Sequence, residues 1–584
     1  NDPGSRPPCR LLHVVEGADY GFQWVYGSAP VHPFVAWNGE LRGTLGMVHP
    51  SGEGPCAVVP LGGGVIIPSW SDHRVEYYPL TRNGAGYTSD RIVLVEGGDF
   101  FRPTGMAMGP DGAFYFNDWV FSSYPIHGRG RLWKLEIDPA AATWRKATPD
   151  PPTDASRLAA DLREGHIDKP DSELLALARS DDPYLADAAL SALARKRVAH
   201  TPASLRAMPP QDRVLALVAL RRIDLNEEKW VRACLDDPDP EMRFECLRWI
   251  ADAVLTGFSA DVEKVLSDPL IDFRLFEAAL AAWNTLRGEP GAGVTHPEVL
   301  TGKILDPATP AKLKGYALRL APASHPKLTM EVLRHLLTAR EPELSLEVVR
   351  TLVARNSDEA RVLLAEIAAD EALDPALRAD AVTGLAASAL PEHRELLFVL
   401  AGDGHAPIRD EALRALRGVT PDEEGKATLT HIVSTHPETA ALVQTILDPA
   451  SLNAGRPAFD DTAAWLARLE SVPGEADLAA GRRLFFHPKL ALCSSCHRHG
   501  GRGIVLGPDL SLAGRQGTRE ALLRSILEPQ REVAPQFFPS LVKRKDGTEF
   551  IGILLRSSDR EVFRDLTGQE KSFHPPRFQC MLID

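Results

Sequence analysis

The sequence predicts a multidomain chain with three parts in order. These are a β region forming a partial β-propeller, an α-solenoid of helix pairs, and a mainly α domain with a small β insert. Three observations indicate this order. The 584 residues are too many for one hydrophobic core. The composition changes after a Pro-rich stretch at 147–154, and a helix-pair repeat then continues to about residue 450. The domains are therefore expected at 1–146, 155–455 and 470–584.

The bulk composition excludes several classes of protein. Hydrophobic residues make up 44% and charged residues 25% of the chain, which is typical of globular proteins. Asp and Glu number 79 against 65 Lys and Arg, so the formal net charge is −14 and nucleic-acid binding is not expected. No stretch approaches the roughly 18 consecutive apolar residues that cross a bilayer, so we expect no membrane span.

The β region contains two similar segments, 65–80 and 113–137, each with two short strands separated by a polar turn. Their Trp70 and Trp119 lie roughly 50 residues apart, a spacing typical of propeller blades. Between them, Gly-Pro-Asp-Gly at 109–112 predicts a hairpin. Two or three blades cannot close a ring, so we expect the end of a propeller whose beginning is missing.

The solenoid is predicted from amphipathic helices punctuated by Asp-Pro turns. Arg243 to Arg274 and Arg378 to Arg409 each repeat at about 31 residues, a helix-pair period. The turn and the Arg that follows it resemble those of HEAT repeats. Such arrays act as spacers or docking surfaces, and we expect no chemistry in this one.

The last region carries the sequence Cys493-Ser494-Ser495-Cys496-His497, after a predicted helix at 477–486. Two thiols three positions apart reach both vinyl groups of one haem, and the following His supplies an axial ligand to the iron. The pattern predicts one covalently attached haem c, with Cys493 and Cys496 as attachment points and His497 as the metal ligand. We therefore expect a cytochrome c domain.

Three alternatives compete with haem attachment. A structural zinc site needs a second ligand pair, and only Cys580 and His499 lie nearby or downstream. A thioredoxin-like redox pair follows a strand, whereas this motif follows a predicted helix. Coincidence is the third alternative. A chance match to the motif is rare in a chain with 7 Cys and 18 His.

The residues around the motif resemble those of cytochromes c. Gly481 and Phe485 lie one turn apart on the preceding helix, where cytochromes c have a close helix–helix contact and a packed aromatic ring. The Gly-Pro-Asp-Leu sequence at 507–510 resembles the loop whose Pro carbonyl accepts the Nδ1–H of the proximal His. In this chain the bond would join His497 to Pro508. An ordinary turn is the competing interpretation of this sequence.

The sixth iron ligand is assigned by elimination. Met581 is the only Met after the motif, and a Met thioether suits electron transfer. Because it lies three residues from the end of the sequence, a ligand beyond Asp584 is the alternative. The other candidates, expected to be surface histidines instead, are His487, His499 and His574.

Taken together, these features resemble the large multidomain haem proteins of planctomycetes and verrucomicrobia. That family joins a glucose/sorbosone dehydrogenase-like propeller, HEAT-like repeats and a cytochrome c domain. The cytochrome match covers the motif, 507–515, 525–537 and 545–554, and the propeller match covers 11–24 and 101–119. The family usually supplies its distal Met from a Ser-x-Met-Pro motif, and this chain has Cys-Met-Leu instead. The resemblance implies a fragment truncated at its N-terminus and also at its C-terminus.

The resemblance implies electron transfer through haem c, with electrons from an attached sugar or alcohol dehydrogenase-like propeller. The resemblance also implies a pyrroloquinoline quinone (PQQ) cofactor in the complete propeller and a sugar substrate. It further implies a partner protein or quinone that donates or accepts electrons. The alternative is a non-catalytic haem protein with a carbohydrate- or protein-binding propeller. Enzymatic activity is therefore one of two hypotheses. His13, Asp72 and Arg131 could face the propeller centre, although structural roles are expected. Haem attachment implies a periplasmic or otherwise exported protein.

Overall fold

The structure is a computed structural model of the chain. It describes residues 9–21, 32–36, 38–52, 54–121, 126–138, 140, 142–196, 201–223, 228–472, 474–511, 513–516, 518–529, 539–544, 547–557, 561–565, 569–573 and 578–582. The chain is multidomain, combining many helices with several small antiparallel sheets. None of the described helices has the length and apolar character needed to cross a membrane.

The N-terminal β region consists of short antiparallel strands. They are β1 (Arg10–Leu11), β2 (His49–Pro50), β3 (Val59–Leu61), β4 (Gly64–Ser69), β5 (Arg74–Pro79), β6 (Thr81–Asn83), β7 (Gly86–Thr88), β8 (Ile92–Glu96), β9 (Pro103–Met108), β10 (Phe114–Asp118) and β11 (Arg131–Leu135). One sheet has the order β3-β4-β5-β8, a second has β11-β10-β9, and neither closes on itself among the described strands. Alternating side chains of both sheets, including Ile66, Tyr77 and Phe114, share one buried core.

The hairpin predicted at 109–112 is present between β9 and β10. Gly112 adopts φ +78°, a left-handed conformation that Gly enters without steric cost. The Gly109 N–H donates to the Ala113 carbonyl at 2.8 Å and closes the turn. The turn therefore fixes the pairing at the hairpin end of these strands, where Phe114 lies opposite Met108.

A long run of helix pairs follows, which we call the helical array (154–453). Its members are α1 (Asp154–Glu164), α2 (Asp171–Leu177), α3 (Pro183–Arg195), α4 (Pro202–Arg206), α5 (Pro210–Arg221), α6 (Glu228–Leu235), α7 (Pro240–Asp252), η2 (Thr256–Phe258), α8 (Ser259–Leu266), α9 (Phe273–Leu286), η3 (Pro290–Ala292), α10 (Pro297–Leu305), α11 (Ala311–Leu320), α12 (Met330–Leu337), α13 (Pro342–Arg355), α14 (Asp358–Ala369), α15 (Pro375–Leu385), α16 (Pro391–Leu400), α17 (Ala406–Ala415), α18 (Glu423–Thr435), η4 (Pro437–Thr439), α19 (Ala440–Leu447) and η5 (Pro449–Asn453). From α3 to α19, each odd-numbered helix contacts the next odd-numbered one. This succession is compatible with an α-solenoid.

The Asp-Pro turns of the array have two physical roles. The Asp caps the next helix, as Asp239 does by accepting from the Glu241 N–H, while Pro240 occupies the first helical turn where no backbone donor is needed. In α5, α7, α15 and α17, an Arg also reaches an acidic side chain 24 to 29 residues further on. These pairs are Arg213 with Asp237, Arg243 with Asp268, Arg378 with Asp403, and Arg409 with Glu438. The repeated Arg is therefore a tie between consecutive helix pairs.

The C-terminal region begins with helices and ends in a sheet. Its elements are α20 (Thr462–Glu470), α21 (Leu478–Phe485), η6 (Cys493–Ser495), β12 (Arg498–His499), β13 (Arg502–Gly503), α22 (Ala513–Gln516), α23 (Arg519–Leu527), β14 (Pro539–Arg544), β15 (Glu549–Ser557), β16 (Glu561–Asp565), β17 (Glu570–Phe573) and β18 (Phe578–Leu582). The strands expected within 538–555 and 560–573 are present. They form an antiparallel sheet in the order β17-β16-β15-β14-β18.

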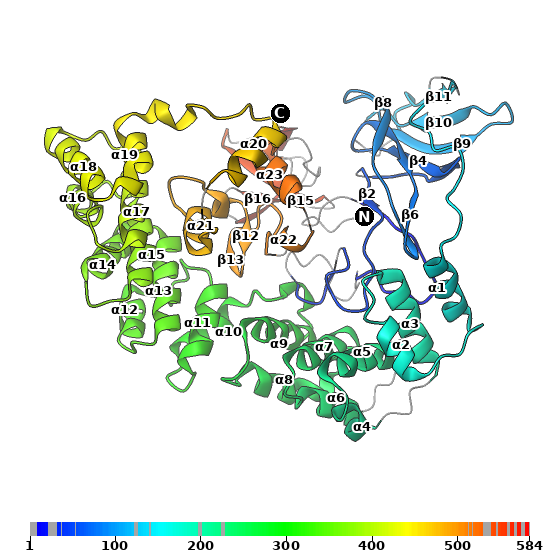
Figure 1. The fold of residues 1–584 in the computed structure, drawn as a ribbon, viewed down its shortest axis with the longest axis horizontal. Coiled ribbons are helices and arrows are strands. Elements are labelled where there is room, and N and C mark those ends of the chain that lie inside the picture. The colour runs from blue at the N-terminus through cyan, green and yellow to red at the C-terminus, as the bar shows by residue number, and fades with distance from the viewer. Residues whose placement is uncertain are drawn as a thin grey trace.

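The three parts are arranged around the curve of the helical array (Figure 1). The array runs as an arc from α1 to α19, the β region lies beyond the α1 end, and the C-terminal region lies on the inner side of the arc. Two ion pairs join the C-terminal region to the array. Arg483 contacts Glu411 of α17, 72 residues earlier in the sequence, and Arg502 contacts Glu347 of α13, 155 residues earlier. The arc thereby holds the Cys-x-x-Cys-His motif against its inner face.

Candidate functional site

The two cysteines and the histidine of the motif lie on a single tight turn. η6 follows Leu492, which adopts a left-handed backbone conformation with φ +55°. The Cys496 N–H and the His497 N–H both donate to the Cys493 carbonyl, at 3.2 and 2.9 Å. Cys493 is half-buried and Cys496 is exposed. This backbone presents two thiols and one imidazole from five consecutive residues.

The ring of His497 is held in one tautomer. Its Nδ1 lies 2.9 Å from the carbonyl oxygen of Pro508. A carbonyl oxygen only accepts, so Nδ1 carries the proton and donates, which leaves the lone pair of Nε2 available to a metal. The contact expected between these two residues is therefore present in the described structure.

Gly507 also shapes this site, a role that the sequence pattern at 507–510 did not predict. A Cβ at this position would lie 2.6 Å from Cε1 and 2.9 Å from Nδ1 of the His497 ring. The Gly507 N–H also donates to the Cys496 carbonyl at 2.7 Å, which ties the loop to the motif. Glycine is needed here because the imidazole packs directly on the backbone.

His487 differs from the expectation of a surface histidine. It is fully buried, and burial, with smaller contributions from Lys489 and two arginines, lowers its pKa to about 4. Its Nδ1 accepts from the backbone N–H groups of Lys489 and Leu490, both at 3.1 Å. The neutral ring must then carry its proton on Nε2, the reverse of the tautomer of His497. An iron ligand needs that nitrogen unprotonated, so this geometry disfavours His487 as the sixth ligand.

The other residues named around the motif are dispersed. Phe485 packs at 5.0 Å from the Phe486 ring and 5.5 Å from the His499 ring, between centroids. His499 is exposed, as expected. The close helix contact expected at Gly481 is wrong for the described part of the chain, because a Cβ there would meet no atom within 4 Å. His574 lies outside the described residues.

Met581 lies in the edge strand β18, where its backbone pairs with Leu541 of β14. The sheet approaches the motif through another strand: Arg564 of β16 donates to the Val505 carbonyl at 2.5 Å. Three strand spacings separate β16 from β18, which is about 14 Å. Cys580, the other residue considered downstream, lies in β18 as well. Met581 as distal ligand remains a prediction.

Arginines of the C-terminal region dock it on the array, through contacts that no pattern in the sequence predicted. Arg502 of β13 donates to Glu347 Oε2 at 2.7 and 3.0 Å and to Thr351 Oγ1 at 3.0 Å. Burial alone would raise the pKa of Glu347, but the charges of Arg502, Arg350 and Arg319 outweigh it and lower the pKa to about 2. The array is therefore a docking surface for the chain's own C-terminal region.

The three polar residues considered at the propeller centre make separate local contacts. Arg131 pairs with the buried carboxylate of Asp118 at 2.7 Å. Asp72 lies 3.9 Å from Arg74, and the ring of His13 packs against Tyr184 of the array. These contacts agree with the structural roles expected from the sequence.

Among the described residues, no three His, Cys, Asp or Glu side chains gather as they would around a free metal ion. No protein-family model matches the chain, and no curated protein matches it. Among solved structures, human deoxyhypusine hydroxylase in complex with glycerol is similar at 16% identity. The match covers 44% of this chain and 98% of that one, with a TM-score of 0.19.

Proposed function

We propose that the C-terminal region is a c-type cytochrome domain that carries one covalent haem and transfers electrons. The observation that carries this proposal is the His497 Nδ1–H bond to the Pro508 carbonyl, which presents Nε2 as a ligand. Such a bond orients a metal-binding imidazole and increases its basicity. The turn of Cys493 and Cys496 would supply the thioethers, and Gly507 makes room for the ring. Bound haem supplies a one-electron couple.

Electrons for this haem would come from the β region in its complete form. The four-stranded and three-stranded antiparallel sheets support a partial propeller of the sugar or alcohol dehydrogenase type, with PQQ as its cofactor. An electron-accepting protein or quinone would take the electron onward. The helical array, read as HEAT-like repeats, would fix the distance between the two parts, and haem attachment would place the protein in the periplasm.

The test is a spectrum of the whole chain after expression in a periplasm that attaches haem. Reduction should produce the Soret and α absorption bands of haem c. The haem should also migrate with the protein in a denaturing gel, because thioether bonds survive unfolding. The matched control is a Cys493→Ala/Cys496→Ala variant, which should lose the covalent pigment. A purified wild-type chain without these bands would show that the cytochrome proposal is wrong.

A second candidate function, ligand binding by the β region, is favoured by one observation. A hollow of about 490 Å³ lies between β8 and β11 and is lined by aromatic side chains. Phe100 is 62% and Trp133 41% exposed there, with Arg131 and Lys134 alongside. Aromatic faces flanked by polar groups suit carbohydrate binding. Titrating glucose while following Trp fluorescence in wild type and Trp133→Ala tests it, and an unchanged signal in wild type would reject it.

A further inference from the structure

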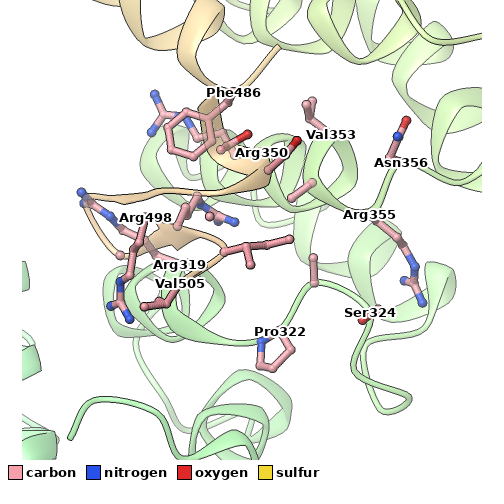
Figure 2. Close-up of a pocket in the computed structure, with 18 of the residues that line it drawn as sticks. Arg319, Pro322, Ser324, Arg350, Val353, Arg355, Asn356, Phe486, Arg498 and Val505 are labelled. Atoms are coloured by element: carbon pink, nitrogen blue, oxygen red, sulfur yellow. The ribbon is translucent and has the colours of Figure 1, made fainter. Parts of the chain in front are cut away.

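A cavity of about 1150 Å³ lies between the helical array and the C-terminal region. Helices α11, α13 and α15 form one wall, and residues 482–505 form most of the other. Figure 2 shows Arg319 and Arg350 of the array and Arg498 of β12 among its lining residues. Ser494 and Ser495, the two residues between the motif cysteines, also line it. The cavity therefore adjoins the candidate haem site without including His497.

The walls of this cavity are cationic although the chain as a whole is acidic. Eight arginines line it, and six carboxylates pair with them. Positive charges exceed negative ones by at least two, because burial raises the pKa of one of these carboxyls, Glu277, to about 7. Two of the arginines, Arg319 and Arg355, have only backbone, sulfur or aromatic partners within the described structure. An anion of charge about −2 would balance this excess of positive charge in the cavity.

Arg482 gives a second sign of uncompensated charge. Its closest carboxylate oxygen, on Asp380, is 4.0 Å away, and its guanidinium lies over the Phe486 ring. Burial lowers the pKa of Arg482 to about 10, with repulsion from Arg350 added. The Arg482 side chain is half-buried, and such a cation is stabilised by an opposite charge brought within hydrogen-bond distance.

Two buried side chains that line the cavity hold donors with no hydrogen-bond acceptor among the described protein groups. Arg498 is 4% exposed, and its Nε and Nη2 lack such partners, with Asp509 and Glu277 oxygens at 3.5 Å. His487 is 0% exposed, and its protonated Nε2 also lacks an acceptor. Leaving a buried donor unsatisfied costs about 1–3 kcal/mol. These three nitrogen atoms are inaccessible in the described structure, so they add positive electrostatic character beside the cavity and not direct contacts to a ligand.

We infer that this cavity binds a small oxyanion carrying two or more carboxylate or phosphate groups, held by Arg319, Arg482 and Arg498. The planar guanidinium group of arginine donates two parallel hydrogen bonds to the oxygen atoms of a carboxylate or phosphate group. The volume exceeds that of a single phosphate ion and suits a di- or tricarboxylate or a phosphate ester. Because the ligand would contact both the array and the C-terminal region, it would strengthen their association.

The oxyanion could be a free molecule or the two propionates of an attached haem, and the experiment separates these sources. Citrate, and separately inorganic phosphate, is titrated into the full chain by calorimetry at constant ionic strength. The haem-loaded protein and the haem-free Cys493→Ala/Cys496→Ala variant form the two arms. Citrate binding in both arms identifies a site for a free anion, and binding in the haem-free arm alone identifies propionates as the occupants. Binding in neither arm overturns the inference.

Charge-neutral variants locate the site. Arg319→Gln and Arg482→Gln, each in the haem-free background, should weaken citrate binding at least tenfold. Arg334→Gln is the matched control, because this arginine pairs with Glu366 on the exposed side of α12 and does not line the cavity. It should change binding less than twofold. If both cavity variants bind citrate as tightly as the control does, the anion lies elsewhere and the inference is overturned. The outcome does not depend on the cytochrome proposal.

Discussion

Replacing Arg502 with Met should loosen the C-terminal region from the helical array. The guanidinium of Arg502 makes two contacts to Glu347 Oε2, one to the Glu347 carbonyl and one to Thr351 Oγ1, all within 3.0 Å. Methionine keeps much of the length and apolar character of the side chain but makes none of these contacts. Glu347 would stay buried with Arg350 as its remaining close cation, at 2.9 Å.

The magnitude follows from the burial of this pair. Removing one partner of a buried ion pair costs about 3–5 kcal/mol because the other charge stays buried. The pKa of Glu347, lowered from 4.5 to about 2 by its arginines, corresponds to about 3 kcal/mol of favourable interaction with the ionised carboxylate. Since Arg350 still shares that carboxylate in the variant, we expect about 3 kcal/mol, the lower end of the range.

Hydrogen exchange of peptides covering η6, β12 and β13 measures this loss directly. About 3 kcal/mol corresponds to a roughly 150-fold faster exchange, at about tenfold per 1.4 kcal/mol. Combining Arg502→Met with Glu347→Gln should cost less than the two single changes added together, because the double variant buries no orphaned charge. Exchange within about twofold of wild type in Arg502→Met would refute the docking role of this ion pair.

Four further outcomes are expected. Gly507→Ala should move the His497 ring, costing about 1–3 kcal/mol of stability and shifting the haem spectrum, while the control Gly481→Ala should leave both unchanged or slightly improved; equal behaviour of the two variants would contradict the packing argument. Because the folded-state pKa of Glu347 is lowered, the stability it contributes should be complete above about pH 4.5 and lost as the pH falls toward 2; Glu347→Gln should flatten that part of a pH-dependent unfolding curve. Met581→Ala should lower the reduction potential if Met581 is the distal ligand, and an unchanged spectrum and potential would remove it. His487→Gln should leave the reduced haem spectrum intact, whereas loss of a low-spin spectrum would show that His487 binds the iron.

Local features were predictable from the sequence because their causes lie within a few residues. Gly112 and its neighbours specify the hairpin between β9 and β10, and Asp239 with Pro240 specifies the start of α7. The spacing of Cys493, Cys496 and His497 fixes their common turn. The bond from His497 to Pro508 spans only 11 residues, so a resemblance in one loop was enough to anticipate it.

Only the tertiary structure decided the surroundings of that turn. Arg502 and Glu347 are 155 residues apart, and they meet because the curvature of many successive helix pairs accumulates, which no local pattern encodes. The same docking buries His487, expected at the surface, near Arg414 of α17 and Arg417, which follows that helix. Met581 lies in β18, at the edge of the five-stranded sheet. Its distance from the motif depends on the order in which the strands pair, and the position of Met581 in the sequence does not reveal that order. The sequence by itself thus determined the motif and its turn, and packing between distant segments decided the cationic cavity beside it.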